Sequence, residues 1–114
     1  MNQLKELKLK TGGQWIVSDT GEKEIFCREK FSEDHKAIEQ LINEFARDKI
    51  FPNVFNLDKL NEKLSKSLIQ EMGSLGLIGV DAPEKYGGSE LDKISACIIA
   101  EGVSRGGSAS FGCT

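Results

Sequence analysis

The segment SEDHKAIEQLINEFARDKI, residues 32–50, carries the strongest periodic pattern in the chain. Its apolar side chains recur at steps of three and four residues: Ile38, Leu41, Ile42, Phe45, Ala46 and Ile50. This spacing is typical of one face of an amphipathic helix. Ser32 is a good N-cap, and the two acidic residues after it suit the positive end of the helix dipole. Because Pro52 cannot continue a helix and disfavours helical geometry at Phe51, we expect this helix to end near Ile50.

A second apolar stripe predicts one further helix, with its leucines in the core. Its members are Leu57, Leu60, Leu64, Leu68, Met72 and Leu75. Gly76 stands just past the stripe, where a left-handed glycine commonly ends a helix. Gly73, inside the last turn, costs about 0.8–1 kcal/mol relative to alanine. We therefore expect close packing against another helix at Gly73.

A third helix is predicted from Ser89–Asp92 to Arg105, where Gly106–Gly107 stops it. The Ser-x-x-Asp start resembles a capping box. Apolar residues cover most of its circumference, which is typical of a helix that is buried on several sides. Ser108 is a candidate cap for a fourth helix, although the chain stops within about two turns of it. We therefore predict an all-α fold over residues 32–114, an incomplete up-and-down bundle of about three helices plus the start of a fourth.

The connector at residues 77–88 begins apolar and ends in helix breakers. An apolar loop is expected to lie over the core, and Gly87–Gly88 allows a tight turn with positive φ. Residues 1–31 form a different region, an irregular N-terminal arm. Gly12–Gly13 and Thr20–Gly21 mark turns, and residues 14–17 have the composition of a short extended piece. Three apolar residues of the arm are expected to pin it onto an apolar surface: Trp15, Ile16 and Phe26.

Composition excludes several classes of function. The chain of 114 residues has a formal net charge of −3, so no strongly basic face is available for nucleic acid. Its three cysteines are widely spaced and it has one histidine, too few ligands for a zinc site. The odd cysteine count favours a reducing compartment. The first ten residues match neither a signal peptide nor an arginine-rich transit peptide, and no apolar run is long enough to span a membrane, so we expect a cytoplasmic protein.

The residues by themselves predict no catalytic, cofactor-binding or metal site. The glycine-rich stretch 102–112 lacks the Lys-Ser/Thr of a phosphate loop, so a helix-to-helix turn is the favoured interpretation. His35 is expected to be an exposed surface residue rather than a base or ligand. Glu101 is interpreted as the one solvent-facing residue of this helix or as half of a buried ion pair with Arg105 at i+4. The structural ion pair is favoured over a catalytic acid.

Three segments in order resemble acyl-CoA dehydrogenases. Phe31–His35 resembles the start of that family's first helix. Residues 72–88, MGSLGLIGVDAPEKYGG, resemble its ELGLLGI…PEEYGG segment, and residues 91–108 resemble the following LD…IAEEIARGGS helix. Residues 12–31 resemble the lead-in of very-long-chain-like members. Gly102 and Ala82 depart from the family pattern, at positions where a glutamate and an aliphatic residue are usual.

The resemblance implies an oxidoreductase of several domains that binds FAD and an acyl-CoA thioester. In this family a glutamate of the C-terminal domain removes the α-proton, and a β-hydride passes to the flavin. Electrons then go to an electron-transferring flavoprotein, and members commonly form homo-oligomers. The catalytic glutamate and the main flavin-binding segments lie outside residues 1–114. The resemblance thus implies a truncated N-terminal domain that is inactive alone.

By the same resemblance, the region from Ser108 leads into a helix beside the acyl-chain cavity. The candidate substrate-binding residues are therefore Phe111, Gly112 and Cys113. A free-standing, non-catalytic helical binding module that reuses this half-fold is the alternative. Related acyl-CoA oxidase or nitroalkane-type chemistry is not separated from dehydrogenation by these residues.

Overall fold

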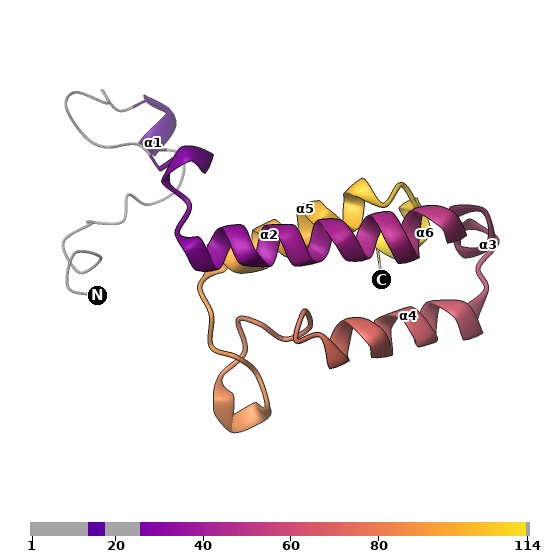
Figure 1. Cartoon of the computed structure of the whole chain (residues 1–114). Coiled ribbons are helices and arrows are strands. Elements are labelled where there is room, and N and C mark those ends of the chain that lie inside the picture. Colours follow the sequence, from indigo (N-terminus) through magenta and orange to yellow (C-terminus); the bar gives the residue numbers. More distant parts are fainter. Residues whose placement is uncertain (1–13, 18–25, 114) are drawn as a thin grey trace. The chain divides into compact units, whose positions relative to one another are not determined.

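The computed structural model describes residues 14–17 and 26–113, and these residues contain helices and no strand. They fall into two compact units that divide between Lys30 and Phe31. The all-α fold class is therefore confirmed for the described part of the chain (Figure 1).

The first unit contains the helical turn α1 (Gln14–Val17) and a 3-10 turn at Arg28–Lys30. The extended piece predicted for residues 14–17 is thus wrong. The β-propensity of such residues reflects packing on a sheet, and the described residues supply no partner strand. Ile16 is 69% exposed. The turns predicted at residues 12–13 and 20–21 lie outside the described residues, and the apolar contact of the arm stays a prediction.

Helix α2 (Glu33–Phe45) begins at the predicted Ser32 cap, but the chain does not leave helical geometry at Ile50. A π-helical segment (Ala46–Ile50), a 3-10 turn (Phe51–Asn53) and α3 (Val54–Asp58) follow directly. The expected stop at Pro52 is wrong, because Phe51 keeps right-handed helical angles, φ −55° and ψ −45°. The wider turn, in which the Phe51 N–H reaches the Ala46 carbonyl, accommodates the proline ring and its missing donor.

The second predicted helix is two helices, α3 and α4 (Glu62–Ser74). Leu60 breaks it with a left-handed φ of 59°. Asn61 then caps α4, since its side chain accepts a hydrogen bond from the Leu64 N–H at 3.1 Å. Only part of the stripe is core: Leu60 and Leu75 are exposed, whereas three members are buried, namely Leu57, Leu68 and Met72.

The end of α4 matches the predicted glycine stop. Gly76 has φ 73°, and the Leu77 N–H donates to the Met72 carbonyl at 3.0 Å. The close packing expected at Gly73 is wrong, because an added Cβ there would meet no atom within 4 Å. Tight glycine contacts occur in α5 instead.

The connector after α4 lies over the core, as predicted. Leu77 and Val80 are 4% and 5% exposed. Gly87 has φ 84°, which confirms the predicted turn after a 3-10 turn at Glu84–Tyr86. A Cβ on Gly88 would lie 2.1 Å from the Ala82 carbonyl oxygen, so this position also requires glycine.

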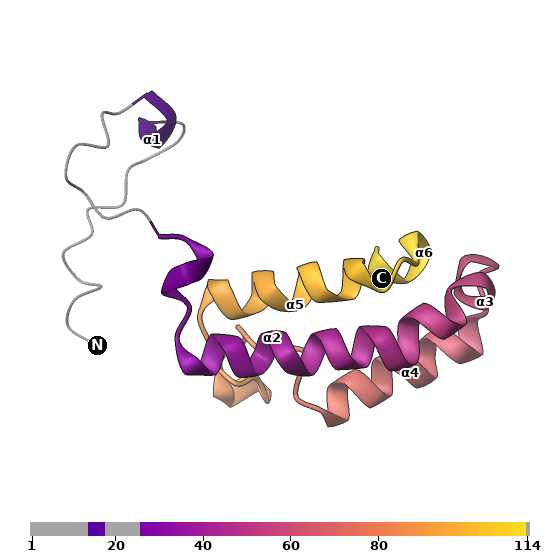
Figure 2. The same cartoon turned by 45° about the horizontal axis from the view of Figure 1, so that its top comes forward.

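Helix α5 (Lys93–Arg105) begins at the end of the predicted starting range, with Asp92 rather than Ser89 as the N-cap. It runs along α2 (Figure 2). A Cβ on Gly102 would lie 2.5 Å from two side-chain carbons of Ile42, so glycine sets the close approach of the two helices. The helix is buried along the side that carries Ile98 and Ile99, so the burial on several sides that the sequence predicts is only partial in this chain. One face is exposed: Cys97, Ala100, Glu101 and Ser104.

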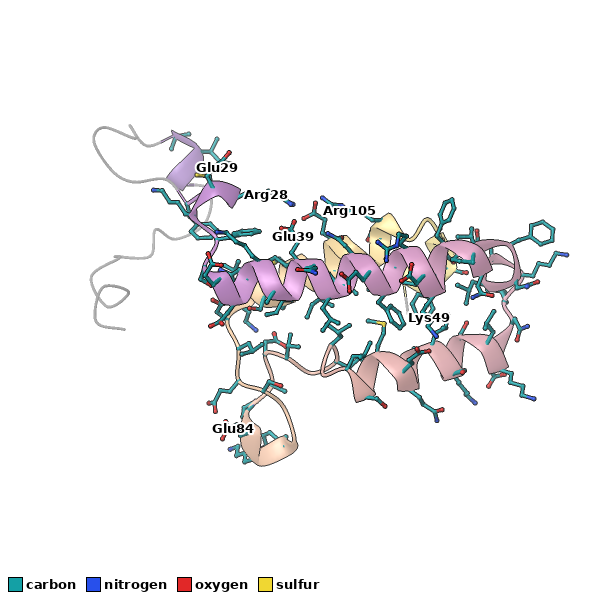
Figure 3. All side chains as sticks on the ribbon, viewed as in Figure 1. Arg28, Glu29, Glu39, Lys49, Glu84 and Arg105 are labelled. Carbon is teal, nitrogen blue, oxygen red and sulfur yellow. The ribbon has the colours of Figure 1, made fainter. Side chains whose placement is uncertain are left out.

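One hydrophobic core joins these helices and the connector. Its buried members are Ile42, Phe45, Ala46, Ile50, Leu57, Leu68, Met72, Leu77, Val80, Ile98, Ile99 and Phe111. At the core's edge, Lys49 points from the π-helical segment toward α4 (Figure 3). Its Nζ atom lies 2.9 Å from Oε1 of Glu71 and links the two elements.

Candidate functional site

The substrate-binding residues predicted from the sequence lie on α6 (Ala109–Gly112) and directly after it. Ser108 is the N-cap of this helix, as predicted: its Oγ atom accepts a hydrogen bond from the Phe111 N–H at 3.2 Å. The Ser108 side chain is buried, with 3% exposure. Its hydroxyl proton is donated to Oδ1 of Asp58 at 2.7 Å.

Ser110 adds a second contact between α6 and α3. Its Oγ atom lies 2.8 Å from the Leu57 carbonyl oxygen and 3.1 Å from Oδ1 of Asp58. The hydrogen bond from Ser108 is the main influence that holds the pKa of Asp58 below its usual value. Burial raises the pKa of Asp58, whereas the hydrogen bonds from Ser110 lower it further. Asp58 was missed from the sequence, because the Ser108 signal predicts a cap but not the acceptor 50 residues earlier.

The three predicted substrate-binding residues differ in their surroundings. Phe111 is 4% exposed and belongs to the hydrophobic core. Gly112 and Cys113 are exposed. Upstream of α6, Gly107 has φ 87°, so residues 106–107 form the helix-to-helix turn that was favoured over a phosphate loop.

His35 is not the exposed residue that was expected, since only 8% of it is accessible. The Ser32 N–H donates to Nδ1 of His35 at 3.2 Å, and Nε2 lies 2.8 Å from Oδ2 of Asp92. Because Nδ1 accepts a hydrogen bond, the proton of the neutral ring is on Nε2, facing the carboxylate. Phe31 packs against the ring edge-on, with centroids 5.6 Å apart. The histidine is thus a helix cap and an interhelix contact.

Asp92 belongs to the same cluster and caps α5. Its Oδ1 atom accepts hydrogen bonds from the N–H and the hydroxyl of Ser95, each at 2.8 Å. Burial raises the pKa of Asp92, but the bonds from Ser95 and from His35 outweigh it, so the pKa is lower than usual. The Asp92 carboxyl is therefore charged at neutral pH.

Glu101 and Arg105 form the predicted i,i+4 ion pair, at 2.8 Å. Both side chains are about half exposed, 49% and 48%, so the burial predicted for this pair is wrong and the pair lies at the surface. Arg105, labelled in Figure 3, also borders a shallow depression of about 430 Å³. The residues that line it are Asn43, Ala46, Arg47, Phe51 and Arg105.

The described residues contain no group of three or more histidine, cysteine or acidic side chains that could hold a metal ion. Cys27, Cys97 and Cys113 are free thiols at the surface. Within the same residues, no helix is both long and apolar enough to cross a membrane.

The fold and this site define an all-α domain in which a capped pair of helices, α2 and α5, carries a short helix at its end. Residues 32–114 match the family model of the acyl-CoA dehydrogenase N-terminal domain. The chain belongs to the acyl-CoA dehydrogenase family, and its residues 32–114 correspond to the N-terminal domain of that family.

Individual relatives agree with this assignment. A probable acyl-CoA dehydrogenase of Bacillus subtilis is 33% identical over 107 residues, which cover 94% of this chain and 18% of that protein. The human mitochondrial short-chain specific acyl-CoA dehydrogenase is 33% identical over 82 residues, 72% of this chain and 20% of the relative. An acyl-CoA dehydrogenase from Bacillus anthracis, solved in complex with FAD, superposes with a TM-score of 0.80 at 38% identity. That match covers 90% of this chain and 17% of the other. The chain thus spans about a fifth of the length of these relatives.

Proposed function

We propose that this chain is the N-terminal part of a flavin-dependent acyl-CoA dehydrogenase and is inactive alone. The reaction is the α,β-dehydrogenation of fatty acyl-CoA thioesters in fatty acid β-oxidation. The observation that carries the proposal is the similarity to the FAD-complexed Bacillus anthracis enzyme, at a TM-score of 0.80 and 38% identity. The proposed subtype is very-long-chain-like, from the resemblance of residues 12–31. Residues 1–31 are proposed as an arm, and 32–114 as an incomplete domain.

FAD is proposed as the cofactor, held mainly by residues outside this segment. When bound, it supplies the acceptor for the β-hydride. The depression beside Arg105 has about 430 Å³ and is open to solvent. Ligand sites bury most of the surface of their ligand, and an open depression does not, so we do not assign the dinucleotide to it. The catalytic glutamate is likewise proposed to lie outside residues 1–114.

The part of the reaction assigned to this chain is to shape the acyl-chain cavity. Phe111, Gly112 and Cys113 are proposed as substrate-binding residues. The Phe111 ring anchors α6 in the core, while Gly112 and Cys113 are exposed and can contact a neighbouring part of the complete protein. The proposed partners are acyl-CoA, an electron-transferring flavoprotein and further copies of the complete protein. The proposed location is the cytoplasm, which cell fractionation tests.

The experiment begins with the coding sequence beyond Thr114, followed by purification of the complete product and of the 114-residue chain. We expect the complete product to carry flavin absorbance that is bleached by acyl-CoA under anaerobic conditions. We expect the 114-residue chain to show neither flavin nor turnover. A coding sequence that stops after Thr114 would reject the enzyme and favour the non-catalytic helical binding module. Turnover by the short chain would contradict the proposed inactivity.

A further inference from the structure

We propose that Asp58 is a positioning residue for the substrate: its carboxylate holds the start of α6, and α6 thereby sets one wall of the acyl-chain cavity. The positioning rests on contacts among the described residues, and the role in the cavity rests on the proposed function. Asp58 is the last residue of α3, 50 residues before Ser108. It is therefore a tertiary contact and not part of the local cap.

The Ser108 hydroxyl has one proton and uses it for Asp58, at 2.7 Å. Its oxygen at the same time accepts the Phe111 N–H, at 3.2 Å. Ser108 is 3% exposed with the carboxylate in place, whereas Asp58 itself is exposed. If Asp58 is removed, the only described acceptor left for the Ser108 hydroxyl proton is the Ser110 hydroxyl, at the longer distance of 3.3 Å. Loss of the carboxylate therefore loosens the cap as well.

Helix α6 depends on such contacts because it is short. A helix of four residues is a single turn and is not stable by itself. Two anchors hold it: the Phe111 ring in the core, and the two hydroxyls that reach Asp58 and the Leu57 carbonyl. Without Asp58 the ring still holds one side of α6, so we expect a displacement of the helix rather than unfolding of the domain.

Such a displacement changes the cavity without touching the reacting atoms, because the catalytic glutamate and the flavin are proposed to lie in other domains. We therefore expect a change in the selectivity between acyl-CoAs of different chain length, mainly through their KM values. Differences in apolar contact of one methylene typically change selectivity by roughly 10–200-fold. A shift of the wall by less than an atom's width is enough to alter such contacts.

The test compares Asp58→Ala, Asp58→Asn and Glu62→Ala in the complete enzyme, with butyryl-, octanoyl- and palmitoyl-CoA as probes. For Asp58→Ala we expect the ratio of kcat/KM between palmitoyl- and butyryl-CoA to change by about tenfold, mostly through KM. Asp58→Asn keeps an acceptor oxygen for Ser108, so it should restore most of the wild-type ratio. Glu62 forms an exposed pair with Lys66, and its alanine variant should behave as the wild type. An unchanged ratio in Asp58→Ala overturns the role in the cavity.

A second readout is hydrogen exchange of the peptide that contains the Phe111 amide, in the same proteins. Faster exchange in Asp58→Ala than in Glu62→Ala is expected, and equal exchange overturns the positioning. If the wild-type enzyme oxidises none of the acyl-CoAs, the proposed function fails, and the exchange rates alone decide whether Asp58 positions α6. If Asp58→Ala does not fold, Ser110→Ala, which removes one of the two hydroxyls, must give a smaller change in the same direction, or the proposal is rejected.

Discussion

The Nε2 atom of His35 lies 2.8 Å from Oδ2 of Asp92, and this contact joins the starts of α2 and α5. Each residue also serves its own helix. His35 accepts the Ser32 N–H, and Asp92 accepts the Ser95 N–H. The capping side chains of α2 and α5 are therefore joined by one hydrogen bond, which fixes the two helix starts side by side.

Removal of the histidine ring should destabilise the domain. His35→Ala loses a partly buried hydrogen bond to Asp92 and leaves the Ser32 N–H without its acceptor, so we expect the free energy of unfolding to fall by about 1–2 kcal/mol. Chemical denaturation followed by circular dichroism measures it. Lys36→Ala is the control, because it removes only an exposed pair with Glu33 and should change stability by less than about 0.5 kcal/mol. Equal effects of the two variants would contradict a stabilising contact between His35 and Asp92.

Asp92 should make stability depend on acid pH. Since the pKa of its folded form is depressed, the charged carboxylate contributes stability above the ordinary aspartate range, and this contribution is lost as pH falls through the folded-state pKa. We expect Asp92→Asn to be less stable than the wild type at neutral pH, with the two converging below about pH 4. Urea denaturation over a pH series measures the difference. A difference that does not change with pH would show that the lowered pKa contributes nothing.

Two glycine-to-alanine substitutions should change the free energy of unfolding in opposite directions. In Gly102→Ala the new methyl group meets the buried Ile42 side chain at 2.5 Å, and such overpacking typically costs about 1–3 kcal/mol. In Gly73→Ala the methyl group meets nothing within 4 Å, and helix propensity should add about 0.5–1 kcal/mol. Thermal and urea unfolding of both variants test this. If Gly102→Ala were as stable as Gly73→Ala, α2 and α5 would not approach as closely as described.

Leu60 offers a stabilising change at the break between α3 and α4. Its φ of 59° is costly for leucine, while its side chain is 77% exposed and contributes little burial. We expect Leu60→Gly to stabilise the chain by about 1 kcal/mol through relief of the left-handed strain. Leu60→Ala is the matched control, because it shortens the side chain and keeps the strain. If both variants unfold at the same denaturant concentration, the strain is not stored at this position.

Contacts between residues close in the chain were predictable from the sequence. The Ser32 and Ser108 caps, the left-handed Gly76 and the Glu101–Arg105 pair all depend on neighbours within one or two helical turns. Local geometry alone determines such contacts. The same holds for the family assignment, because the motifs that carry it are continuous stretches of sequence.

The tertiary structure alone decided the contacts between helices. Asp92 lies 57 residues after His35, and Ser108 lies 50 residues after Asp58, so no periodicity marks them as partners. The close packing that the sequence predicts at Gly73 is found at Gly102, because only the tertiary packing shows which glycine faces Ile42. Apolar patterning predicts that a helix face is buried, but the residues it meets depend on how the chain packs. The packing of α3 against α6 therefore determines the acceptor of Ser108, and the packing of α2 against α5 determines the partner of His35.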